Sequence, residues 1–161
     1  GMYTNTIIKT EIDEKVIKAF KLDALTRSKL FFKLTTKLAV PFAGVIDGAF
    51  SADRSLVSAS VASLLSQHLD QETFEETQLI LFGSIVEDGE ALATPEAINK
   101  WFEYNDVNPM DLFVWLVDEN LVTLFKGSKQ LQSLKPKFDE FYKKFEDFIP
   151  QTVISDDKAE E

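Results

Sequence analysis

The feature that most constrains the fold is an apolar segment, Met110 to Phe125, in a chain of 161 residues. Leucine, phenylalanine, valine and tryptophan side chains follow one another there, and they leave little polar surface on any side of a helix. A helix that is apolar all round has to be buried in a protein core. We therefore predict that this segment is the central core helix, that it ends at Lys126-Gly127, and that the other elements cover it.

Four residues mark the starts of helices: Asp23, Asp70, Thr94 and Asn108. Their side chains suit the N-cap position, and a proline follows Thr94 and Asn108 at the first helical position. Helical periods of apolar residues follow these starts, and another such period runs over residues 54–69. The inward faces are predicted to carry Leu30, Phe31, Leu34 and Leu38, then Phe74, Leu81, Phe82 and Ile85, then Ile98, Trp101 and Phe102.

The N-terminal residues favour strands instead of a helix. Residues 6–12 and 16–22 are short segments rich in β-branched side chains, and Asp13-Glu14-Lys15 separates them, which is typical of a β-hairpin. With helices expected over about residues 24–149, the predicted fold class is mainly α. It is a compact multi-helix domain, to which a short N-terminal β-hairpin over about residues 6–22 is an optional addition.

The length fits one domain, over residues 1–150. Residues 151–161 carry too little apolar surface to become ordered, so we expect a flexible acidic tail there. No uninterrupted apolar stretch approaches the roughly 18–20 residues that span a bilayer, so no membrane partner is expected. The N-terminal charges do not follow the order of a secretory signal, and we expect a cytoplasmic protein.

The net charge of −10 is distributed unevenly. Residues 1–50 carry +3, residues 51–125 carry −12 and residues 126–161 carry −1. A solvated acidic face is the favoured interpretation, and the alternative is a homo-oligomer in which the acidic middle of one molecule contacts the N-terminal part of another. An acidic protein repels phosphate backbones, so nucleic acid is not the expected partner. The alternative function is a small acidic helical adaptor or regulator that binds nucleic acid through the cations of its first helix, Arg27, Lys29, Lys33 and Lys37.

Residues suited to catalysis or metal binding are scarce. Cysteine is absent, which excludes thiol nucleophiles and disulfides. The one histidine, His68, lies on an apolar helical stripe, where a packed or half-exposed residue is more common than a general base. The carboxylates of residues 70–76 and 87–90 lack the alternating spacing of a calcium loop. We therefore predict no enzyme activity, no catalytic residue, no metal site and no cofactor.

Phenylalanine is abundant, at 14 residues, and it concentrates near the C-terminus. A sharply amphipathic helix is expected from Pro136, with an aromatic stripe on one face. This stripe is either part of the core or an apolar surface that holds a segment of a partner protein. Its candidate partner-binding residues are Phe138, Phe141, Tyr142, Phe145 and Phe148.

Three segments between Lys18 and Phe125, taken in order, resemble a known family. They are KAFKLDALTRSKLFFKLTTKLAVPFAGVIDG, then SVASLLSQHLDQETFEETQLILFGSIVEDGE, and last INKWFEYNDVNPMDLFVWLVDENLVTLF. Their pattern is similar to that of the phage tail assembly chaperones, which are encoded beside the tail tape measure protein. The amphipathic segment from Pro136 lies beyond the resembling part.

The resemblance implies a mostly helical, non-enzymatic protein of the host bacterial cytoplasm. Such a chaperone binds and solubilises the long tape measure protein until tail tube protein polymerises around it. Tape measure protein, and with it tail tube protein, are therefore the partners that the resemblance implies. Amphipathic helices and a net charge of −10 are compatible with that role, because the first supply adhesion and the second solubility.

Overall fold

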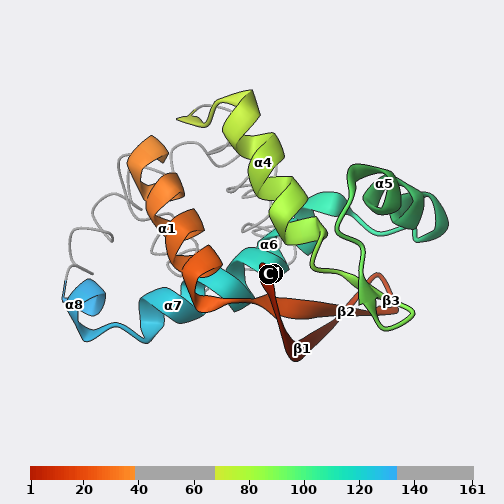
Figure 1. The fold of residues 1–161 in the computed structure, drawn as a ribbon, viewed down its shortest axis with the longest axis horizontal. Helices are drawn as coiled ribbons and strands as arrows, with labels where there is room; N and C mark the ends of the chain where they lie inside the picture. Colours follow the sequence, from red (N-terminus) through yellow and green to blue (C-terminus); the bar gives the residue numbers. More distant parts are fainter. Residues whose placement is uncertain (39–67, 134–161) are drawn as a thin grey trace, which may run out of the picture.

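The structure is a computed structural model, which describes residues 1–38 and 68–133. In Figure 1 the long N-terminal hairpin lies along the lower edge, with helices α1 and α4 standing above it and α5 near the tip of the hairpin. In chain order the elements are β1 (Tyr3–Ile12), β2 (Lys15–Leu22), α1 (Ala24–Leu38), α4 (Gln71–Phe82), β3 (Val86–Glu87), β4 (Glu90–Ala91), α5 (Pro95–Tyr104), α6 (Pro109–Val117), the π-helical segment η1 (Asp118–Val122), α7 (Thr123–Lys126) and α8 (Lys129–Gln132).

The fold is mixed α/β, so the expectation of a mainly α fold was wrong. The described residues contain two antiparallel sheets of two strands each, β1–β2 and β3–β4. A bridge between Ala19 and Ile85 sets the second hairpin beside β2, and the N–H of Phe20 donates to the carbonyl of Ser84 at 2.9 Å. The sequence indicated only a polar turn at residues 87–90, because strands of two residues are too short to show an alternating pattern.

The expected N-terminal hairpin is confirmed, and its strands extend a few residues beyond the predicted segments. Ile12 pairs with Lys15, so Asp13 and Glu14 form a two-residue turn, with φ of 52° and 68°. Positive φ at both central residues is the geometry whose twist matches that of the strands. The Asp13 carboxylate also accepts the backbone N–H of Asn108 at 3.3 Å, which ties the hairpin tip to the start of α6.

All four predicted N-caps are confirmed. Each side-chain oxygen accepts a backbone N–H two or three residues ahead and so satisfies a donor that the helix cannot. The bonds run from Thr26 to Asp23 at 2.7 Å, from Thr73 to Asp70 at 2.8 Å, from Ala97 to Thr94 at 3.2 Å, and from Met110 and Asp111 to Asn108 at 2.8 and 3.2 Å. Local chemistry therefore fixes where these helices begin.

The predicted core helix is confirmed, since every residue of α6 from Leu112 to Val117 is buried. It packs against α4 and β1, while η1 packs against α1 and β2. The helix continues through η1 and α7 to Lys126, and the N–H of Gly127 donates to the carbonyl of Thr123. The π-helical turn in its middle was not predicted, because an inserted turn leaves the run of apolar residues unbroken.

One polar side chain, Asn120 in η1, lies fully buried in this core. Its Oδ1 accepts the backbone N–H of Leu22 at 3.0 Å, and its Nδ2 donates to the carbonyl of Leu116 at 2.9 Å. Residues 98 positions apart are thereby joined at the junction between the hairpin and α1. Buried polar groups are tolerated when they are hydrogen-bonded in this way.

Residues 134–161 and 39–67 lie outside the described residues. They include the expected terminal helix and tail, and most of the helix expected at residues 54–69. One domain over residues 1–150 therefore stays a prediction, as does the tail at 151–161.

The first prediction concerns Asn120. Replacement by alanine leaves the N–H of Leu22 buried without an acceptor, which costs about 1–3 kcal/mol of the free energy of unfolding. Thr123→Ala in the same helix removes an exposed bond to the carbonyl of Glu119, so it should stay within about 0.5 kcal/mol of the wild type. Urea denaturation of the two variants measures both values. Equal losses would show that Asn120 does not hold the hairpin to the core.

The second prediction concerns acid stability. The backbone N–H groups of Thr26 and Thr73 lower the pKa of Asp23 and Asp70 below the ordinary value of 3.8. Because the folded pKa lies below the unfolded one, the stabilisation is complete above the unfolded pKa and is lost as the pH falls through the folded pKa.

We expect the melting temperature of the wild type to fall as the pH drops through this window. The double variant Asp23→Asn/Asp70→Asn, whose amides still cap both helices, should lose less. Circular dichroism melting curves between about pH 6 and about pH 2 measure the difference. Parallel curves for the two proteins would contradict the role given to the capping carboxylates.

Candidate partner-binding surface

Helix α4 has two different faces. Thr73, Thr77 and Leu81 recur every four residues and are buried, and the two threonine hydroxyls donate to Asp70 and to the carbonyl of Thr73. On another face, Glu72, Glu75, Glu76 and Leu79 recur at i, i+3, i+4 and i+7. Positions with this spacing share one side of a helix, so α4 presents a stripe of three carboxylates that ends in a leucine.

That stripe forms one wall of a groove of about 850 Å³, and α5 forms the other wall. The contributing residues of α5 have the same spacing, at Pro95, Ile98, Asn99 and Phe102. We call this feature the α4–α5 groove. We call the exposed carboxylates of Glu72, Glu75 and Glu76 its acidic rim, and we call the apolar residues Leu79, Phe82, Ile98 and Phe102 its floor. Gln78, Asn99 and Pro109 also line the groove.

The floor of the groove belongs to an aromatic cluster. The rings of Phe82 and Phe102 meet edge-to-face, with their centroids 5.2 Å apart, and the ring centroid of Phe82 lies 6.3 Å from that of Phe113 in α6. The ring of Trp101 also meets Phe102 edge-to-face, with a centroid distance of 5.1 Å. Edge-to-face rings add to the stabilisation from burial. The floor of the groove is therefore continuous with the core around the central helix.

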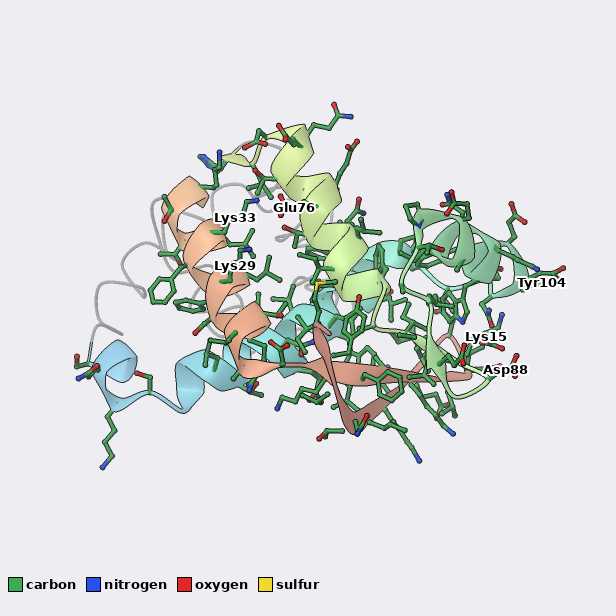
Figure 2. The ribbon with its side chains drawn as sticks, viewed as in Figure 1. Lys15, Lys29, Lys33, Glu76, Asp88 and Tyr104 are labelled. Atoms are coloured by element: carbon green, nitrogen blue, oxygen red, sulfur yellow. The ribbon has the colours of Figure 1, made fainter. Side chains whose placement is uncertain are left out.

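Helix α1 is linked to α4 by ion pairs. Lys33 pairs with Glu76, and Figure 2 shows the two side chains meeting between the helices. The Nζ of Lys37 lies 3.5 Å from the Oδ2 of Asp70, the residue that caps α4. The cations of the first helix and the acids of the middle segment thus meet within one molecule. Two of the four cations that the nucleic-acid alternative requires are neutralised, which counts against it.

Two apolar side chains of α1 point into solvent. Leu25 is 83% exposed and Phe32 is 64% exposed, and Lys29 lies between them at the helical spacing i, i+4, i+7. The expected inward residues Leu30, Phe31 and Leu34 are buried. The outer face of α1 is therefore apolar and cationic, in contrast to the acidic rim of the groove.

Several candidate residues of the sequence prove uninformative about function. His68 is exposed at the end of a helix, not packed in the core. Across residues 1–38 and 68–133 no group of three or more histidine, aspartate or glutamate side chains is placed to hold a metal ion.

The stripe of Phe138, Phe141, Tyr142, Phe145 and Phe148 lies outside the described residues. No described helix is long and apolar enough to cross a membrane.

The groove itself was not predicted from the sequence. Phe74, Phe82, Ile98 and Phe102 were assigned to inward faces, and the structure places them in or against the core. Their assignment did not show that α4 and α5 leave a space between them, since that depends on the path of the connecting hairpin. The available signal for the groove was Leu79, an apolar residue that lies on the same helical face as three glutamates.

The chain is similar to two kinds of known protein. The family described as "Phage tail assembly chaperone protein, TAC" matches residues 13–134. The second is ORF19, a protein of unknown function from a Vibrio cholerae O1 PICI-like element, whose crystal structure was solved as a double mutant. Its sequence is 78% identical to that of this chain. The alignment covers 80% of this chain and 100% of that one, with a TM-score of 0.61. No match was found among curated proteins.

The family match contains the whole range, Lys18 to Phe125, that carries the resemblance seen in the sequence. It covers most of the chain and ends before the aromatic stripe that begins at Phe138. The resemblance is thereby confirmed, and the chain belongs to the phage tail assembly chaperone family.

Proposed function

We propose that this protein is a non-enzymatic chaperone that binds the tape measure protein and keeps it soluble in the cytoplasm of the host bacterium until tail tube protein assembles around it. The family match over residues 13–134 is the observation that carries this proposal. The family fixes a role in phage tail assembly, and the surfaces described above support the choice of partner.

A chaperone for a long, aggregation-prone protein needs accessible apolar surface that does not make the chaperone itself aggregate. Leu25 and Phe32 on α1 and Leu79 in the groove offer such surface. Charged residues accompany each of these positions, and the net charge of −10 keeps separate molecules apart. Adhesion and solubility are therefore combined on the same helices.

Three of the carboxylates in residues 70–76 have structural partners. Asp70 caps α4 and lies near Lys37, Glu76 pairs with Lys33, and Glu75 accepts a hydrogen bond from Gln71 at 2.8 Å. A catalytic acid or base is usually marked by a pKa shifted toward the working pH. The hydrogen bonds from Thr73 shift the pKa of Asp70 away from that range, to a lower value, as expected for a residue that caps a helix.

The terminal aromatic stripe of Phe138, Phe141, Tyr142, Phe145 and Phe148 is a second proposed partner-binding surface. It lies beyond the part of the chain that the family shares. We propose that it adds contact area for the same partner, because aromatic side chains bury much surface at a modest cost in entropy.

The third prediction tests the proposed partner. Coexpression with the tape measure protein encoded by the neighbouring gene should move that protein into the soluble fraction and allow both to be copurified. An unrelated aggregation-prone helical protein, coexpressed in the same way, should stay insoluble. A tape measure protein that stays insoluble and does not copurify would contradict the proposed function.

A further inference from the structure

We propose that the α4–α5 groove binds an amphipathic helix that is basic. Apolar side chains on one stripe of that helix would occupy the floor of the groove, and lysine or arginine side chains flanking the stripe would reach the acidic rim. The inference rests on the proposed function only for the identity of the protein that contributes the helix. The chemistry of recognition comes from the groove itself.

The apolar floor supplies the contact area. Leu79 is 39% exposed on the α4 wall, and Phe102 is partly buried on the α5 wall. The apolar residues Pro95, Ile98 and Phe102 follow one side of α5, and Leu79 and Phe82 line the same groove from the C-terminal part of α4. An amphipathic helix presents an apolar strip and docks into apolar grooves through it.

The acidic rim supplies the charge. Glu76 already pairs with Lys33, whereas Glu72 and Glu75 make no ion pair among the described residues. Within residues 71–82 the helix carries three carboxylates and no cation. A basic helix would therefore be oriented by Glu72 and Glu75 along one side of the groove. Such rim charges mainly set the rate of association and the choice of partner.

Other occupants fit the groove less well. A nucleic acid or an anionic ligand would be repelled by the rim, because its carboxylates face phosphate groups. A small molecule is usually held by convergent polar groups inside a pocket, whereas the charged groups of this groove lie on its rim. A second copy of the chain carries a net charge of −10, which opposes association.

The fourth prediction uses the full chain and three fluorescein-labelled peptides of about 18 residues. The first carries leucines at helical spacing flanked by lysines, the second has the same leucines flanked by glutamates, and the third has the composition of the first in an order without an apolar face. Fluorescence anisotropy at about 50 mM and about 300 mM salt measures their affinities. We expect the first peptide alone to bind, and to bind more weakly at high salt.

The matched variants change charge inside or outside the groove. Glu72→Gln/Glu75→Gln should weaken binding of the first peptide roughly three- to tenfold. Glu14→Gln/Glu90→Gln changes two exposed residues, one in the β1–β2 turn and one at the start of β4, and should leave binding unchanged. Leu79→Ser should weaken binding at both salt concentrations, because it removes apolar contact and not charge. Melting curves confirm that each variant is folded.

Equal binding by the lysine and glutamate peptides, or equal effects of the two double variants, would overturn the proposal. Self-association of the wild type that Leu79→Ser abolishes would assign the groove to a second copy of the chain instead. Copurification separates this inference from the proposed function. If the triple variant Glu72→Gln/Glu75→Gln/Leu79→Ser still solubilises the tape measure protein, the groove proposal fails and the function stands. If the wild type binds the peptide but not the tape measure protein, the function fails.

Discussion

One helix of this protein has to be buried, and the other elements cover it. From Leu112 to Val117 each residue of α6 is at most 3% exposed, so the helix has no face that could meet water. The β-hairpin, α1 and α4 are arranged around α6 and η1 to cover that surface. The hydrophobic effect is not directional, so it does not by itself set the positions of these elements. Directional hydrogen bonds set these positions at a few points: the N–H of Leu22 donates to the Asn120 side chain, and the N–H of Asn108 donates to the Asp13 carboxylate.

These hydrogen bonds explain how the described residues keep the α4–α5 groove accessible while the core stays closed. The hydroxyl of Tyr3 donates a hydrogen bond to the carbonyl of Ile80, near the C-terminal end of α4. Gly83 permits this close approach because it has no side chain: a Cβ at this position would lie 2.6 Å from the Tyr3 hydroxyl. Desolvation raises the pKa of Tyr3 and so favours the neutral hydroxyl that donates this bond. With one face of α4 held in this way, its glutamate stripe and Leu79 stay on the opposite side, where α5 completes the groove. The surface that we assign to a partner is thus a consequence of how the core is closed.

Much of this architecture could be predicted from the sequence because its signals are local. The N-caps at Asp23, Asp70, Thr94 and Asn108 act within three residues, and the apolar run at 110–125 requires burial whatever surrounds it. The mixed α/β class, the π-helical turn and the groove could not be predicted in this way. The mixed class and the groove depend on how segments distant in the sequence lie together, such as Ala19 beside Ile85. The π-helical turn leaves the run of apolar residues unbroken and so gives no signal in the sequence. The uneven distribution of charge along the chain was visible in the sequence. The sequence did not show that Lys33 and Glu76 would form an ion pair within one molecule.

We propose that the buried α6–η1 helix supports α4 and α5 as the surface that receives a partner. Hydrogen–deuterium exchange of the free chain and of its complex with the tape measure protein tests both parts at once. We expect the slowest exchange in the free protein at residues 112–122, and new protection on binding at residues 71–82 and 95–104. Exchange at 112–122 as fast as in α5, or new protection confined to the β1–β2 hairpin, would contradict the account.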